Sequence, residues 1–233
     1  MPKQEAVKEE QIIQPTAKKI DKEFIAQIVI IAVLALLLLY NSRNISGTGS
    51  VISNVGNVGN IGTVAASEII PTGIPKVYGK ELGVSYDDIS PSDQRKADST
   101  IAVLGNLDNQ ITLTGADLQR YISIASKISC EYCCGAESII FSNGQAACGC
   151  AHSYAMRGLA KYLITKHGSE YLDEQILEEL GKWKVLFFPG VHAQKAAVLK
   201  SQGIEFNYIN LASNKYRGIE KGQSSSGEMV GGC

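Results

Sequence analysis

Residues 130–152 read CEYCCGAESIIFSNGQAACGCAH. This stretch holds five of the chain's six cysteines and one of its three histidines. Several sulfur atoms gathered so tightly are typical of metal sites and of disulfide exchange, because few other functions need them within bonding reach. The sequence therefore predicts a small domain organised around a thiol site.

The beginning of this stretch resembles a zinc knuckle. In a knuckle, two thiolates about three residues apart grip a metal, as Cys130 and Cys133 are spaced to do. A glycine such as Gly135 then permits the tight turn. Cys134 adjoins Cys133, so these two side chains cannot easily reach the same metal in good geometry.

The middle and end of the stretch predict a short β-hairpin followed by a helix. The pair Asn143-Gly144 supplies the two positive φ angles that a two-residue turn between residues 138–141 and 145–147 needs. A helix expected to begin near Ala151 would place further ligands at its positive end, where thiol pKa values are lowered. Knuckle, hairpin and helix follow one another in the order of a treble-clef metal site. The ligands expected at the start of the helix are Cys148, Cys150 and His152.

More candidate donors are present than the four of a closed zinc site. Our first choice is Cys130, Cys133 and Cys150 with either Cys148 or His152. Less favoured donors are Cys134, Cys233 and Met229. Because there are more sulfur donors than zinc needs, copper is an alternative metal, since Cu(I) accepts two or three soft ligands.

Two metal-free interpretations compete with the metal site. Outside the cytoplasm, two disulfides could staple a small helical domain without any metal. A redox-active dithiol could instead use Cys130 and Cys133, with Cys134 or Cys148 as the resolving thiol. The spacing favours the metal, and the compartment inferred below favours the disulfides.

Amphipathic periodicity predicts a mainly α-helical fold around this site. One helix has Ser90 as its cap and runs to about Leu104, and a second covers residues 114–128. The helix that begins near Ala151 is expected to end at Gly168 in a left-handed conformation. A fourth helix begins near Asp173.

Residues 184–211 are ambiguous between helix and a strand-helix-strand unit of the glutaredoxin type. The strands would be residues 185–188 and 204–211, around a helix from 189 to 202. The position where such folds carry their cysteine pair has no thiol here. We therefore interpret the segment as structural, and His192 as a packing or surface histidine rather than a ligand.

An uncharged apolar run, FIAQIVIIAVLALLLLY, occupies residues 24–40. As a helix it covers about 25 Å, enough to cross a bilayer core if Lys22 and Arg43 snorkel. We expect an uncleaved single-pass anchor at 24–41, because the tail 1–23 is long for a signal peptide and no cleavage pattern follows. Lysines concentrate before the span, which predicts a cytoplasmic N-terminus and a cysteine domain outside the cell membrane.

The remaining composition divides the chain into a linker, a domain and a tail. Residues 42–70 are rich in Gly, Ser and Asn and predict a flexible tether. The cysteine-rich helical domain is expected at 71–220. The polar tail 221–233 ends in Cys233, which could return to the cluster as a ligand or link the chain to a partner or a second copy.

Charge and motifs exclude several function classes. The formal net charge of -1 and the lack of a basic stretch with interleaved aromatics argue against nucleic acid binding. The sequence shows no Ser-His-Asp set, no phosphate-binding glycine loop and no paired carboxylates in an apolar setting. These absences make an enzyme the less favoured reading.

Residues 113–183 resemble a bacterial family of exported proteins named for its PCYCGC motif, Pro-Cys-Tyr-Cys-Gly-Cys. The resemblance is carried by the helix from Leu118 to Ile128, the run Ser129-Cys-Glu-Tyr-Cys-Cys-Gly135 in place of that motif, and the alanine-rich and acidic helices that follow. It implies an exported, membrane-tethered location and a metal or thiol role for Cys130, Cys133 and Cys150, and it supplies no reaction.

The sequence thus predicts a membrane-anchored, extracytoplasmic protein that binds zinc or copper. It would act as an interaction module or as a metal carrier. The alternative is a thiol-disulfide oxidoreductase or a disulfide-stapled domain without metal.

Overall fold

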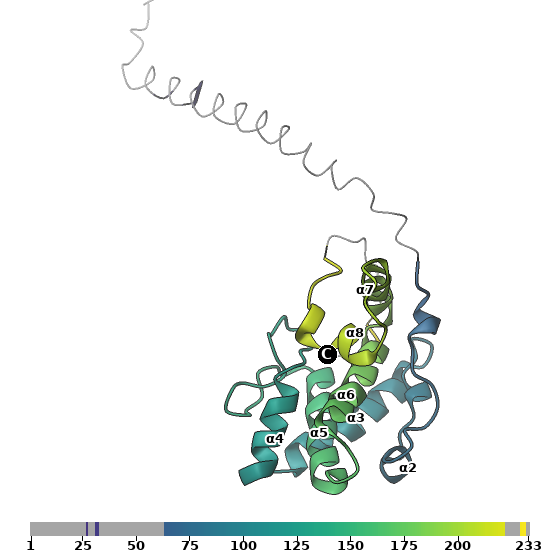
Figure 1. The fold of residues 1–233 in the computed structure, drawn as a ribbon, viewed down its shortest axis with the longest axis vertical. Coiled ribbons are helices and arrows are strands. Elements are labelled where there is room, and N and C mark those ends of the chain that lie inside the picture. The colour runs from purple at the N-terminus through teal and green to yellow at the C-terminus, as the bar shows by residue number, and fades with distance from the viewer. Residues whose placement is uncertain (1–26, 28–30, 33–62, 222–228, 232–233) are drawn as a thin grey trace, which may run out of the picture. The chain divides into compact units, whose positions relative to one another are not determined.

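The computed structural model describes residues 27, 31–32, 63–221 and 229–231 (Figure 1). The predicted tail 1–23, most of the predicted anchor 24–41 and of the linker 42–70, and Cys233 lie outside these residues. Within the part that is described, no helix is both long enough and apolar enough to span a bilayer. The chain divides into two units, Met1–Val58 and Gly59–Cys233, and the cysteine stretch belongs to the second.

This unit is mainly helical, and its described residues contain no β-sheet. Helix α5 is central, because it packs along α3 and also contacts α4 and α6 (Figure 1). The short α8 packs on α6. The α-helices are α2 (Gly79–Leu82), α3 (Gln94–Gln110), α4 (Gly115–Ala125), α5 (Ala151–His167), α6 (Asp173–Phe187), α7 (Pro189–Ser201) and α8 (Tyr208–Ala212). The 3-10 helices are η1 (Ala66–Glu68), η2 (Tyr86–Asp88) and η3 (Asn214–Tyr216).

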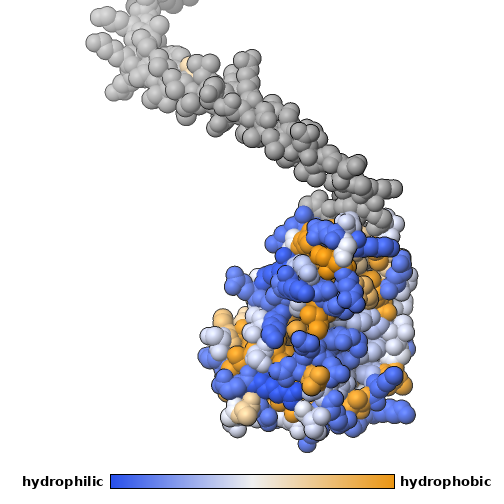
Figure 2. All heavy atoms as spheres, viewed as in Figure 1, coloured by the Kyte–Doolittle hydropathy of each residue, from blue (hydrophilic) through white to orange (hydrophobic). Residues whose placement is uncertain are grey.

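The α3–α5 contact forms the main core of the domain. Met156, Leu159 and Leu163 on α5 are fully buried, at the helical spacing that the sequence predicts. Gly158 permits the close approach, since a Cβ there would overlap the carbonyl oxygen of Leu104 on α3. The face of the domain that Figure 2 shows is mostly hydrophilic, with separate hydrophobic patches.

The segment before α3 packs against the domain through buried aromatic side chains. Tyr78 and Tyr86 are buried, and their hydroxyls donate hydrogen bonds to Glu179 on α6 at 2.7 and 2.5 Å. The indole N–H of Trp183 donates to the Tyr78 hydroxyl at 2.8 Å. This polar cluster ties the segment to α6.

Helix α3 begins and ends later than predicted. The cap is Asp93, whose carboxylate accepts from the Lys96 N–H at 3.1 Å, whereas the Ser90 hydroxyl pairs with Ser92. The helix continues beyond Leu104 to Gln110 because its last turns still contact α5, where Asp108 pairs with Arg157 at 2.7 Å.

The end of α5 also differs from expectation. Gly168 has φ -61°, so it is right-handed and not left-handed. Arg120 on α4 donates from Nη1 to the Gly168 carbonyl at 2.8 Å and satisfies this helix end instead. A side chain from another helix therefore replaces the local glycine cap.

The hairpin is reduced to one bridge, between Ile140 and Ala146. The Phe141 N–H donates to the Gln145 carbonyl at 2.8 Å, and Gly144, with φ +84°, donates to the Phe141 carbonyl at 2.9 Å. Asn143 does not adopt a positive φ. The turn therefore has three residues with glycine in the left-handed position, not the two-residue form predicted from Asn143-Gly144.

The strand-helix-strand interpretation of residues 184–211 is wrong. The apolar run after Lys184 continues α6 to Phe187, α7 follows, and the second expected strand contains α8. Val185, Leu186 and Phe187 are all buried, so burial decided their conformation against their β preference. His192 is buried and packs edge-on against Tyr132 at 5.5 Å, as a packing histidine does.

Candidate metal centre

Four of the predicted ligands converge. One ligand atom each from Cys130, Cys133, Cys150 and His152 lies within 4.8 Å of all the others. The Sγ atoms of Cys130 and Cys150 are 3.3 Å apart. The ligand atoms of a tetrahedral zinc site lie about 3.5 to 3.8 Å from one another, so this group could hold a metal ion.

The start of α5 positions two of these ligands. Cys150 is the N-cap residue, and its sulfur accepts a hydrogen bond from the Ser153 N–H at 3.4 Å. Its thiol therefore occupies the place where a serine or aspartate side chain usually caps a helix. His152 is in the first turn and is fully buried.

The imidazole of His152 is oriented by the far end of the chain. Its Nε2 lies 2.9 Å from the carbonyl oxygen of Val230, which can only accept. Nε2 therefore carries the proton, and Nδ1 is the nitrogen suited to a metal. The ring also packs against Phe187 and Phe188, with centroids 4.6 and 5.1 Å away.

The two facing thiols differ in acidity. The pKa of Cys150 is lowered to about 4, chiefly by its hydrogen bond with Cys130, and further by hydrogen bonds with His152 and Ser153. The same contact with Cys150, together with burial, raises the pKa of Cys130. One thiolate is thus already favoured in the folded protein, and a metal would draw the second proton off.

Disulfides occupy the neighbouring cysteines. Cys134 is bonded to Cys148, and these two cysteines form a second close group with Cys150, separate from the four-residue group. Cys133 is also disulfide-bonded, whereas Cys130 and Cys150 are free thiols, so the complete ligand set belongs to the reduced protein. Of the less favoured ligands, Met229 is 40% exposed, and Cys233 lies outside the described residues.

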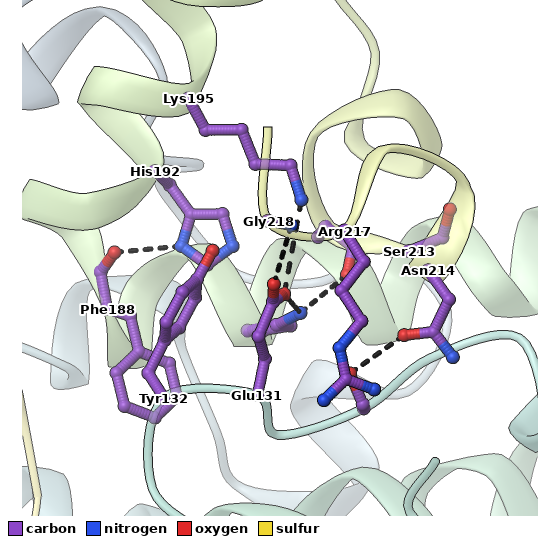
Figure 3. A network of polar contacts seen from close by, with 12 residues as sticks. Glu131, Tyr132, Phe188, His192, Lys195, Ser213, Asn214, Arg217 and Gly218 are labelled. Carbon is purple, nitrogen blue, oxygen red and sulfur yellow. Dashed lines mark hydrogen bonds and ion pairs between the residues drawn. The ribbon is translucent and has the colours of Figure 1, made fainter. Parts of the chain in front are cut away.

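Glu131, inside the knuckle, has an unusual backbone. Its φ is +58°, a left-handed value that non-glycine residues rarely adopt. Its carboxylate accepts from Lys184 Nζ at 3.1 Å and from the Gly218 N–H at 2.9 Å, and lies 4.0 Å from Lys195 Nζ (Figure 3). These partners hold the turn that directs the knuckle cysteines toward α5.

The two lysines of this network have almost no exposed surface. Burial lowers the pKa of Lys184 to about 8, although Glu131 opposes the effect. Lys184 also donates to the Ala212 carbonyl at 2.8 Å, which connects the knuckle to α8. Buried lysines are unusual, and Lys184 interacts electrostatically with Cys130 of the candidate site.

Tyr132 packs this network against α7. Its ring contacts Phe188 and His192 at centroid distances of 5.3 and 5.5 Å (Figure 3). Its hydroxyl donates to Glu220 at 3.2 Å. Phe188 also contacts His152, so the knuckle and the candidate histidine ligand share this packing.

Reasoning from the sequence missed the residues that support the ligands. Lys184 could have been noticed as a charge within the apolar run WKVLFF, since such a charge is either exposed or paired. Ser153 stands three residues after a capping residue, which is also a recognisable spacing. No local signal identifies the carbonyl of Val230.

Comparison with known proteins identifies no relative that could inform this site. No family model matches the chain, and searches of curated proteins and of solved structures gave no match.

Proposed function

We propose that the domain binds one transition-metal ion through Cys130, Cys133, Cys150 and His152. The observation that carries this proposal is the convergence of four soft or borderline ligand atoms within 4.8 Å. The orientation of His152 by Val230 supports it, because metal-binding imidazoles commonly donate their second nitrogen to a carbonyl.

Zinc is the metal that this set fits best. Three cysteines and one histidine form a closed tetrahedral set of the structural type, with no position left for a substrate. Cu(I) would need only two or three of the sulfurs and would leave the imidazole without a role. We therefore assign zinc to the full set, with copper as the competing ion.

The charges around the site support a bound metal–thiolate group. Zinc with three thiolates carries one net negative charge. Lys184 and Lys195 together with Glu131 carry one net positive charge, and Lys184 interacts electrostatically with Cys130. The buried lysines would thus be balanced when the metal is present.

A closed site implies a structural or interaction role rather than catalysis. The metal would join a knuckle, a turn and the start of a helix, in the manner of a treble clef, and so contribute to folding free energy. With the anchor expected at 24–41, the domain would present this module outside the cytoplasm. A carrier role would apply if the ion is copper.

Elemental analysis of the full chain, reduced and purified without chelator, tests the proposal. One zinc per chain is expected, and Cys150→Ala and His152→Ala should lose it. His167→Gln, at the other end of the same helix, is the matched control and should keep it. Metal-free wild-type protein after incubation with excess zinc would refute the proposal.

Thiol–disulfide exchange is the second candidate function, because a free thiol lies close to a disulfide bond. Cys150 Sγ lies 3.5 Å from Cys148 Sγ, which is bonded to Cys134. Attack by the Cys150 thiolate on Cys148 would form a Cys148–Cys150 disulfide and release Cys134, an exposed residue, as the thiolate. Trapping of a mixed disulfide at Cys134 with a small disulfide reagent, lost in Cys150→Ser, would favour this function.

A further inference from the structure

A polar pocket lies on the α4 side of α5, apart from the four-ligand group. Its volume is about 320 Å³. It is open to solvent and is lined by the end of α3, by α4, by α5 and by the turn at residues 144–146. The polar side chains that matter below are Asp108, Tyr121, Arg157 and Lys161, all of which line it.

Arg157 is the central side chain of this pocket, and it is 1% exposed. Its Nε donates to Asp108 at 2.7 Å, and its Nη1 donates to the carbonyls of Cys148 and Ile139 at 2.8 and 3.3 Å. Its Nη2 is buried and has no hydrogen-bond partner among the described residues. A guanidinium nitrogen can only donate, so the missing partner must be an acceptor.

A second buried group in the pocket lacks a partner as well. The hydroxyl of Tyr121, on α4, has no hydrogen-bond partner among the described residues, and the residue is 1% exposed. Burial raises the pKa of Tyr121, which keeps the hydroxyl protonated and able to donate. Two orphaned donors from facing helices thus line one pocket.

The charge of the pocket selects the class of acceptor. Lys161 donates to the carbonyl and carboxylate of Asp108, both at 2.7 Å, and Arg157 pairs with the same carboxylate. Two cations therefore share one anion, which leaves one positive charge uncompensated. A neutral acceptor would satisfy the hydrogen bonds but not this charge.

We propose that this pocket binds a small oxyanion, a carboxylate or phosphate group, through Arg157, Tyr121 and Lys161. The oxygens of such a group accept several hydrogen bonds at once and match the donors of a guanidinium. Because Arg157 also holds the Cys148 carbonyl, the bound group would brace the segment that leads to Cys150. The inference does not depend on the metal.

Calorimetric titration of the full chain tests this inference, with inorganic phosphate and acetate as separate probes and chloride at matched ionic strength. Tyr121→Phe removes one donor and keeps the ring, and Lys161→Gln removes one charge. Each should weaken binding by about tenfold, the typical effect of losing a charge-assisted hydrogen bond. Lys166→Gln, on the same helix but exposed, is the matched control and should bind as the wild type does.

The outcomes separate the sources of the oxyanion. Binding of phosphate alone identifies a phosphate group as the ligand, and binding of acetate alone identifies a carboxylate. No saturable binding of either probe by the wild-type chain would overturn the inference. Equal binding by Tyr121→Phe, Lys161→Gln and the wild type would also overturn it, because the anion would then sit elsewhere.

Discussion

The sulfur atoms of Cys130 and Cys150 lie 3.3 Å apart across 20 residues of sequence. One sulfur belongs to the knuckle, and the other caps α5. The ends of the cysteine stretch therefore meet at a single point, as a shared metal would require.

Because the backbone of Glu131 is left-handed, we expect a glycine variant to be more stable than an alanine variant at this position, the reverse of the usual order. Both Glu131→Gly and Glu131→Ala lose the contacts of the carboxylate, but only glycine adopts φ +58° without strain. Glu131→Gly should therefore be more stable than Glu131→Ala by about 1 kcal/mol. Urea denaturation of the two variants measures the difference, and an alanine variant as stable as the glycine variant would contradict it.

Replacing Lys184 should lower the free energy of unfolding more than replacing an exposed lysine does. Lys184→Met removes the nearest cation of the buried Glu131 carboxylate, which keeps the Gly218 N–H and the more distant Lys195, and breaking a buried pair costs about 3 kcal/mol. The same change should speed the loss of zinc to a chelator, because the thiolates lose a nearby positive charge. Lys166→Met, at an exposed position, should change neither the denaturation midpoint nor the rate of zinc loss.

Gly158 is expected to tolerate no side chain. A Cβ there would overlap the Leu104 carbonyl and force α3 away from α5, which should cost at least about 2 kcal/mol. Gly149→Ala is the control, since nothing lies within 4 Å of its Cβ position. Thermal unfolding of the two variants compares them, and equal melting temperatures would contradict the close packing described above.

His167 should make stability depend on pH. Burial alone would lower the pKa of His167, but hydrogen bonds with Glu170 and Glu81 raise it above 6.5. The pKa of Glu81 is lowered below 4.5, first by its hydrogen bond with Tyr162 and then by the one with His167. The histidine's contribution is complete below pH 6.5 and is lost as the pH rises through its folded-state pKa. The Glu81 contribution is lost as the pH falls through its own lowered pKa.

The difference in melting temperature between wild type and His167→Gln should therefore be largest between pH 4.5 and 6.5 and shrink above that window. Both proteins are compared in the same metal state, so that the thiols titrate alike. The transition lies between about pH 5 and about pH 9. A difference in melting temperature that stays constant over this range would contradict the raised pKa of His167.

The sequence was informative where local rules operate. The start of α5 beside Cys150 and His152 follows from capping and periodicity, and the mainly helical class follows from the apolar stripes. The grouping of Cys130 and Cys133 with Cys150 could also be predicted, because a knuckle, a turn and the start of a helix supply the ligands in this order in treble-clef sites. These features depend on residues close together in the chain.

The features that escaped prediction depend on partners distant in sequence. Gly168 could not be recognised as right-handed without Arg120, 48 residues away, and the run from Lys184 to Phe187 is helical because it is buried. His152 gains its orientation from Val230, 78 residues later. Such contacts arise only when the helices have packed.

The most direct test of the central claim is X-ray absorption at the zinc edge of the reduced, zinc-loaded chain. We predict three sulfur ligands at about 2.3 Å and one nitrogen at about 2.0 Å. His152→Ala should lose the nitrogen shell, and Cys150→Ala should lose one sulfur or the metal altogether. A shell of oxygen and nitrogen alone, unchanged in both variants, would contradict a metal held by Cys130, Cys133, Cys150 and His152.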